Sequence, residues 1–330
     1  MTIRIGIIGT GVMGADHART LRATISGASV EAVFDVDARR AATAAAGARV
    51  LDDPLALIKD VEVDAVLIAS SDATHEDFVL ASIAAGKPVL CEKPLAPDVA
   101  GCLRIIDAEL AAGRRLVSVG FMRRYDAGYT SLRRTLAAGE IGAPLLMHCV
   151  HRNVSVPDGF TGSMLVTSSA AHEIDITRWL LGEEIVAVTS HRPRASSLVG
   201  ALPDPQFLVF ETASGVLVDV EVFVNARYGY DVRCELVGER GTATLAPEAP
   251  TLVRRDASAS RAIPHDWRDR FAGAYAHELQ DWVDGIGAGA ARGASAWDGY
   301  AATAVAQAGV AALESGRTAV ELVTKPPLYK

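Results

Sequence analysis

The sequence predicts an α/β protein of two domains: a doubly wound parallel sheet over residues 1–120, then an α+β domain with an open, mainly antiparallel sheet over residues 121–330. Three observations predict this fold. Strand-like and helix-like segments alternate in the first third of the chain, a glycine-rich turn joins the first strand to the first helix, and two hairpin patterns adjoin in the second half. A length of 330 residues also fits two domains of roughly 150 residues each.

The candidate strands of the first third are apolar on both faces, which is typical of a parallel sheet covered by helices on both sides. We expect strands at 3–8, 30–34, 65–69, 88–91 and 116–119, and helices at 15–25, 38–46, 76–85 and 99–112. This alternation predicts a Rossmann arrangement.

The pattern changes near Gly120, where we expect the second domain to begin. Strand-like segments at 207–211 and 216–224 flank one turn, and segments at 232–237 and 242–245 flank another. Adjacent hairpins predict an antiparallel sheet. A further strand is expected at 145–152, and helices at 172–181, 270–286 and 296–313.

Composition limits the classes of partner. Lys and Arg number 32 against 40 Asp and Glu, so the net charge of −8 disfavours nucleic-acid binding. No apolar run approaches the ~18 residues that span a bilayer, and residues 1–9 lack a secretory pattern, so we expect a cytoplasmic protein without a membrane partner. The four cysteines, Cys91, Cys102, Cys149 and Cys234, lie far apart and are expected to be buried thiols.

The glycine-rich turn has the spacing G-x-G-x-x-G and consists of Gly9, Thr10, Gly11, Val12, Met13 and Gly14. In such a turn the first glycine permits a tight bend, the second lets the backbone approach a pyrophosphate, and the third lets helix and strand pack closely. The N-terminus of the following helix attracts phosphate. The turn therefore predicts a bound dinucleotide.

Asp35 stands at the end of the second expected strand, 21 residues after Gly14. A carboxylate there bonds to the ribose hydroxyls and repels a 2′-phosphate, so NAD is the expected cofactor. Arg39 and Arg40 lie just downstream and could soften this exclusion, which keeps NADP as the alternative.

Glu92, Lys93 and Pro94 follow the expected strand 88–91, at the edge where open α/β sheets bind ligands. Pro94 restricts the backbone, so Lys93 is held rather than trailing. Position alone leaves two readings of Lys93, a solvated surface group or a site residue.

Further segments extend the pattern along most of the chain. They are 9–14, 75–76, 85–89, 91–95, 120–126, 148–153, 172–175, 228–231 and 274–275. In these segments the chain resembles the glucose–fructose oxidoreductase/inositol dehydrogenase (Gfo/Idh/MocA) family, and it is most similar to the bacterial inositol 2-dehydrogenases within that family. The likeness runs from residue 5 to about residue 285.

The resemblance implies an NAD-dependent dehydrogenase of inositol catabolism that oxidises a ring hydroxyl of myo-inositol or a related inositol. It implies that Lys93 stabilises the developing alkoxide and that His172 accepts the hydroxyl proton while a hydride leaves for the nicotinamide. Both roles suit the side chains, because a cation favours an alkoxide and an imidazole titrates near neutral pH. The resemblance also implies cofactor contacts from Ser70, His75, Glu92 and Lys93, and substrate contacts from Arg123, His151, Asn153, Ser168, Asp175, Tyr230 and Tyr275.

Structural readings stay open for several of these residues. Asp175 lies one helical turn from His172 and could instead pair with Arg178. The others could make structural hydrogen bonds. His148 and His151 would face opposite sides of a strand, so no metal site is expected.

Ser168 departs from the pattern of inositol dehydrogenases, which have an aspartate four positions before the catalytic histidine. A serine can orient the imidazole but cannot stabilise its protonated form. Three outcomes follow: slower inositol oxidation, a different polyol or sugar, or recruitment of Asp175 or Glu173 in its place.

Two other functions remain as alternatives. One is a dehydrogenase of the same family that acts on another sugar or an aminocyclitol, and the other is a sensor that binds dinucleotide and sugar without turnover. The strand 216–224 alternates between two rows of side chains, and one face of its sheet needs a cover, for which a partner sheet is one candidate. The pattern does not give the oligomeric state, but the resemblance implies a homotetramer built through this sheet.

Overall fold

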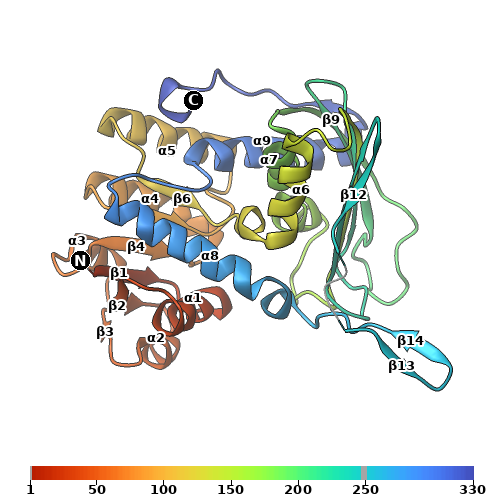
Figure 1. Cartoon of the computed structure of the whole chain (residues 1–330). Helices are drawn as coiled ribbons and strands as arrows, with labels where there is room; N and C mark the ends of the chain where they lie inside the picture. The colour runs from red at the N-terminus through yellow and green to blue at the C-terminus, as the bar shows by residue number, and fades with distance from the viewer. Residues whose placement is uncertain (1, 247–250) are drawn as a thin grey trace. The chain divides into compact units, whose positions relative to one another are not determined.

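The computed structural model describes residues 2–246 and 251–330. The chain forms two compact units (Figure 1). The first consists of Met1–Met122, Tyr275–Thr303 and Leu322–Lys330, and the second of Arg123–Ala274 and Ala304–Glu321. The predicted division at residue 120 falls near the first break in the chain. The prediction assigned all residues after 120 to the second domain, whereas Tyr275–Thr303 and Leu322–Lys330 belong to the first unit. Local patterns carry no information on such long-range packing.

The first unit contains a parallel sheet, as predicted, but with six strands where five were expected, because the two-residue strand at residues 49–50 was missed. The strands are β1 (Ile3–Ile8), β2 (Ala28–Phe34), β3 (Arg49–Val50), β4 (Ala65–Ile68), β5 (Val89–Cys91) and β6 (Val117–Val119), in the order β3-β2-β1-β4-β5-β6. Since the order reverses beside β1, the carboxyl ends of β1 and β4 mark the point where such sheets bind ligands.

Five helices connect these strands: α1 (Val12–Ala23), α2 (Ala38–Ala45), α3 (Pro54–Lys59), α4 (His75–Ala84) and α5 (Val99–Ala112). Asp37, Asp53 and Asp98 begin three of them, because each carboxylate accepts hydrogen bonds from free N–H groups of the first turn. Four of the helices were predicted. Helix α3 was not predicted, although its Asp-Pro start is a typical helix signal.

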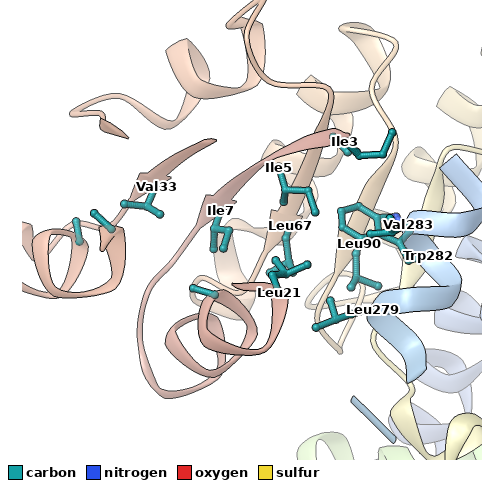
Figure 2. Close-up of a cluster of buried hydrophobic side chains, with 14 residues drawn as sticks. Ile3, Ile5, Ile7, Leu21, Val33, Leu67, Leu90, Leu279, Trp282 and Val283 are labelled. Atoms are coloured by element: carbon teal, nitrogen blue, oxygen red, sulfur yellow. The ribbon is translucent and has the colours of Figure 1, made fainter. Parts of the chain in front are cut away.

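The two faces of this sheet bury different partners. Ile3, Ile5 and Ile7 of β1 share one core with residues of α1 and α2 and with Leu279 and Trp282 of helix α8 (Trp267–Gly287), as Figure 2 shows. On the opposite face a Cβ at Gly6 would lie 2.5 Å from Leu57 of α3. The sheet is therefore covered on both sides, which explains why its strands are apolar on both faces.

The second unit contains a seven-stranded sheet in the order β12-β11-β7-β10-β9-β8-β15. Its strands are β7 (Pro144–Arg152), β8 (Ile185–His191), β9 (Gln206–Thr212), β10 (Leu217–Phe223), β11 (Asp231–Gly238), β12 (Gly241–Thr244) and β15 (Thr318–Ala319). Both predicted hairpins, β9–β10 and β11–β12, are confirmed. The pair β7–β10 is parallel and the other pairs are antiparallel, so the sheet is mainly antiparallel as predicted.

One face of this sheet is buried within the second unit. Val218, Val220 and Val222 of β10 are fully buried, and the side chains between them are partly exposed. The other elements here are α6 (Ala127–Ala137), α7 (Ala171–Leu181) and a small hairpin of β13 (Val253–Arg255) with β14 (Ser258–Ser260). Helix α8 and helix α9 (Ala296–Ser315) each contribute residues to both units.

Two further features bear on the predictions from composition. The four cysteines are free and buried, as expected. Within residues 2–246 and 251–330, none of the helices combines the length and the apolar character that a membrane crossing needs.

Candidate active site

The glycine-rich turn lies between β1 and α1, where the sequence placed it. Gly9 has a φ of +87°, and a Cβ there would lie 2.5 Å from the backbone of Ala69 and Ser70. A Cβ on Gly14 would lie 1.9 Å from the carbonyl oxygen of Gly9. A Cβ on Gly11 would meet no protein atom within 4 Å. Glycine is thus required by packing at the first and third positions, while the second leaves room for a ligand to approach the backbone.

Asp35 lies directly after β2 and is bonded to this turn. Its Oδ2 accepts hydrogen bonds from the backbone N–H of Thr10 at 2.6 Å and from the Thr10 hydroxyl at 3.1 Å, and its Oδ1 accepts one from the N–H of Asp37. Partial burial alone would raise the pKa of Asp35, but these hydrogen bonds lower it overall. The group is therefore an ionised carboxylate beside the phosphate-binding turn.

A cavity of about 350 Å³ opens beside Asp35 in the first unit. It is lined by Gly9, Gly11, Phe34, Asp35, Val36, Arg40, Ala69, Ser70, Ser71, Thr74 and Phe78. Its volume and its mixture of apolar walls with a few polar groups suit a nucleotide. The predicted residues Asp35 and Ser70 both line this cavity. Of the two arginines that follow Asp35 in the sequence, Arg40 lines it as well.

Glu92 and His75 were predicted to contact the cofactor, and the structure places both inside the first unit. Glu92 accepts a hydrogen bond at Oε1 from Nε2 of His17, 2.7 Å away. Burial alone would raise the pKa of Glu92, but the His17 hydrogen bond and charge lower it overall. Nδ1 of His75 donates to the carbonyl oxygen of Pro94 over 2.7 Å. Lys93 lies between Glu92 and Pro94, the two residues that these histidines hold, and its side chain is half-buried.

In the second unit, the predicted site residues Arg123 and His151 form a buried ionic cluster with Glu173, which is the neighbour of His172 in the sequence. The guanidinium of Arg123 is paired with Glu173, and Nδ1 of His151 lies 3.0 Å from Oε2 of Glu173. All three side chains are buried. Burial raises the pKa of Glu173, but the charges of Arg123 and His151 outweigh it and bring the pKa to about 2. Because the carboxylate can only accept, the hydrogen on Nδ1 of His151 points to Glu173, and Nη2 of Arg123 lies 3.3 Å from the same nitrogen.

His172 lies at the second position of α7, so its place at a helix start is confirmed. The centroid of its ring is 6.2 Å from that of His151, which in turn packs edge-on against Tyr230 at 5.9 Å. Burial raises the pKa of Tyr230 to about 12, so its hydroxyl is a hydrogen-bond donor at neutral pH. The buried Oδ1 of Asn153 has no hydrogen-bond partner among the described residues. The second unit thus gathers acid–base and hydrogen-bonding groups of the kind that bind hydroxyls.

The structure gives Asp175 a different ion-pair partner from the one its spacing suggested, and it places Ser168 in an unexpected turn. The open structural reading paired Asp175 with Arg178, but the structure gives Asp175 a bidentate pair with Arg124, and Arg178 pairs with Glu184. Ser168 lies in a π-helical turn, Leu165–Ser169, that leads into α7. Such π-helical turns often occur at functional sites, and no local pattern in the sequence predicted this one.

Tyr275 lies in the first unit rather than with Arg123, His151 and Tyr230, and its ring packs edge-on against His17 at 5.7 Å. The sequence analysis did not single out His17 or Arg124. His17 could have been found from its spacing, because it follows Gly14 by three residues and lies on the same face of α1. Among the described residues, no group of three or more His, Cys, Asp or Glu side chains is arranged to hold a metal ion.

The turn, the carboxylate beside it and the adjoining cavity have the geometry that suits a dinucleotide, and the second unit holds an imidazole among polar side chains able to bond to hydroxyls. Together these features define a nucleotide-dependent oxidoreductase of alcohols.

Comparison with known protein families shows the family to which this oxidoreductase belongs. The NAD-binding Rossmann fold of the Gfo/Idh/MocA oxidoreductase family matches residues 3–121, and the C-terminal α/β domain of that family matches residues 133–322. The chain belongs to this family and is an NAD-dependent dehydrogenase of CH–OH groups.

Relatives match along the whole chain. Inositol 2-dehydrogenase 1 of Saccharopolyspora erythraea is 57% identical and covers 100% of this chain and 99% of its own length. Inositol 2-dehydrogenase of Pseudomonas fluorescens is 49% identical, with 100% of each chain covered. The crystal structure of myo-inositol dehydrogenase from Lactobacillus casei, in complex with NAD(H) and myo-inositol, superposes with a TM-score of 0.97 at 35% identity and 100% coverage of both chains.

Proposed function

We propose that this protein oxidises a ring hydroxyl of myo-inositol, or of a closely related inositol, to the corresponding keto-inositol with NAD as hydride acceptor. The observation that carries the proposal is the full-length likeness to inositol 2-dehydrogenases, at 57% identity in sequence and a TM-score of 0.97 in structure. The hydroxyl-binding character of the second unit supports it, because an inositol offers a hydroxyl at every ring carbon.

In the proposed mechanism Lys93 and His172 act on the reacting hydroxyl. The Lys93 ammonium donates a hydrogen bond to the oxygen and stabilises the negative charge that develops on it. His172 accepts the hydroxyl proton, a role that suits an imidazole near neutral pH. NAD supplies the hydride acceptor. The remaining predicted residues hold the ring, with Oδ1 of Asn153 as an acceptor and the hydroxyl of Tyr230 as a donor.

Turnover and isotope transfer test this function. NAD reduction is measured across a panel of inositol isomers and pyranoses, with the expected result that myo-inositol or a stereoisomer has the highest kcat/KM. Transfer of deuterium from a C-deuterated substrate to NAD then separates an enzyme from a binding protein. Absence of turnover on every inositol would reject the proposal.

Ser168 favours one second candidate, a dehydrogenase of another sugar or an aminocyclitol. The hydroxyl of Ser168 cannot bear charge, so the site lacks the carboxylate that inositol dehydrogenases have at this position. A cationic aminocyclitol or a pyranose with the highest kcat/KM in the same panel would favour this candidate.

We further propose that the protein is a homotetramer that buries the outer face of the second sheet. Leu146 and Leu217 are register partners on neighbouring strands and remain 38% and 43% exposed, and Val186 is 40% exposed. Apolar side chains grouped on one face of a sheet are typical of a surface that another subunit covers. Light scattering tests this, and a monomeric mass would reject it.

A further inference from the structure

The segment Glu92-Lys93-Pro94 is held at both ends by buried histidines from different helices. His17 of α1 is 1% exposed, and its Nε2 donates to Oε1 of Glu92 over 2.7 Å. His75 of α4 is also 1% exposed, and its Nδ1 donates to the carbonyl oxygen of Pro94 over 2.7 Å. Lys93 is the residue between the two anchors.

The anchor at Glu92 is transmitted to the backbone of Lys93. While Oε1 of Glu92 bonds to His17, Oε2 accepts the backbone N–H of Lys93 at 3.3 Å. The carboxylate also packs against the chain after β6, because a Cβ at Gly120 would lie 3.0 Å from the carboxyl group of Glu92. The carboxyl group is therefore held by an imidazole on one side and by backbone on the other. Loss of the imidazole donor would leave a buried carboxylate short of a partner, and the group would move or take up water.

The anchor at Pro94 is tied to the nucleotide side of the sheet. Nε2 of His75 lies 3.3 Å from the carbonyl oxygen of Ser70, which lines the cavity beside Asp35. His75 thus donates one hydrogen bond, to the residue after Lys93, and its other ring nitrogen lies beside the loop after β4. His17 lies one turn of helix beyond Gly14, so the other anchor begins in the phosphate-binding helix. Both anchors connect Lys93 to elements that build the cofactor site.

We propose that His17 and His75 are positioning residues that fix the Lys93 ammonium for the reaction, and that His17 acts through Glu92. The inference rests on the role proposed above for Lys93. Neither imidazole needs to touch substrate or cofactor in this role. Each holds one neighbour of Lys93, so loss of either donor lets the lysine leave its productive position while the sheet stays folded.

Matched variants separate positioning from stability. His17→Leu and His75→Leu remove the donors, whereas His17→Gln and His75→Asn keep an N–H at the place of Nε2 and Nδ1, respectively. Leu21→Ala is the control, because Leu21 is a buried residue of the same helix α1 that belongs to the core of the sheet. Glu92→Gln is a milder variant that keeps the shape of the carboxyl group, should His17→Leu fail to fold.

We expect the two leucine variants to lower kcat on the order of tenfold to a hundredfold, because a small displacement of a catalytic group has an effect of that size. The amide variants should recover most of this loss, and the KM for NAD should change less than kcat does. Leu21→Ala should lower Tm without this loss of kcat. In a Lys93→Met background His17→Leu should have almost no further effect on kcat, since residues that act as one unit are not additive. Additive losses would overturn the proposal.

A readout without substrate keeps this test independent of the proposed function. The chain has five lysines, so ¹³C-dimethylated lysines give few NMR signals, and Lys93→Arg identifies the signal of Lys93. We expect that signal to shift in His17→Leu and His75→Leu, to return in the amide variants and to stay unchanged in Leu21→Ala. An unshifted signal in folded leucine variants would overturn the positioning role, even if inositol proved to be the wrong substrate. A shifted signal in a protein without inositol turnover would reject only the proposed function.

Discussion

The backbone N–H of Thr10 donates to Oδ2 of Asp35 over 2.6 Å, so the phosphate-binding turn and the end of β2 are joined by a direct hydrogen bond. This bond and those from the Thr10 hydroxyl and the Asp37 N–H hold the pKa of Asp35 below its usual value. The cavity beside Asp35 therefore has a fixed negative charge where a dinucleotide would place the ribose of its adenosine.

Removal of that charge should relax cofactor selectivity. We expect Asp35→Ser to raise the KM for NAD and to raise kcat/KM for NADP, because a 2′-phosphate would no longer face a carboxylate. Arg40 lines the same cavity, so adding Arg40→Ala should reverse part of the gain with NADP. Steady-state kinetics with both cofactors measure this. An Asp35→Ser enzyme that still discriminates as strongly as the wild type would show that selectivity lies elsewhere.

Lys93 and His172 should contribute more to the chemical step than to cofactor binding. We expect Lys93→Met and His172→Gln each to lower kcat by about a hundredfold to ten-thousandfold, the usual range for loss of charge stabilisation or of a general base. The rate of His172→Gln should rise with pH, because hydroxide takes the place of the imidazole. NAD affinity, measured by fluorescence titration, should stay near that of the wild type. A His172→Gln enzyme with near-normal kcat would refute the assignment.

Ser168→Asp tests the missing carboxylate. If proton transfer to His172 limits turnover, a carboxylate at the end of the π-helical turn should raise kcat on inositol several-fold by stabilising the imidazolium. Thr167→Asp is the matched control, since it adds the same charge to the same turn, Leu165–Ser169, at the neighbouring position. An unchanged or lower kcat in Ser168→Asp would remove the argument that this serine limits the rate.

Glu173 should determine part of the acid stability. Its pKa of about 2 in the folded protein lies below the ordinary value of 4.5, so the stability it contributes is fully present above that ordinary value and is lost as the pH falls toward 2. Glu173→Gln should lower the free energy of unfolding at neutral pH by roughly 3 kcal/mol, since it leaves the buried Arg123 without its charge partner. Between about pH 4.5 and about pH 2 the stability of Glu173→Gln should fall less steeply than that of the wild type.

Thermal unfolding of the wild type and the variant across this pH range measures the difference. The control is Glu314→Gln, which removes a surface carboxylate whose side chain is 78% exposed and paired with Arg192. That change should be close to neutral, as exposed ion pairs are. Parallel pH profiles for wild type and Glu173→Gln would contradict the proposed role of the buried pair.

Much of the fold could be predicted because its signals are local. The glycine spacing and the apolar strands of the first unit each lie within a few residues of the element they specify. The hairpins β9–β10 and β11–β12 were likewise predicted from their turns. Helix α6 and strand β8 were missed, although Asp126 caps α6 by accepting hydrogen bonds from the N–H groups of Gly128 and Tyr129.

The candidate site was predictable in its residue types but less so in its pairings. The pattern around His172 was read correctly as a helix start, yet the arginines that pair with Asp175 and Glu173 come from a segment about fifty positions earlier. Local spacing favoured Arg178 for Asp175, whereas the fold supplies Arg124. Charge pairing across a fold depends on which segments pack together, and a single sequence does not contain that information in local form.

Leu279 and Trp282 complete the core of the first sheet from a helix that follows nearly all of the second unit in the chain (Figure 2). During synthesis, the six strands of that sheet leave the ribosome long before α8 does. The nascent chain therefore carries a partly uncovered apolar face, including Ile3, Ile5 and Ile7, while the second unit is still being made. Such a surface is a target for chaperones and a risk for aggregation, so truncated chains that end before α8 should be recovered mainly as insoluble protein.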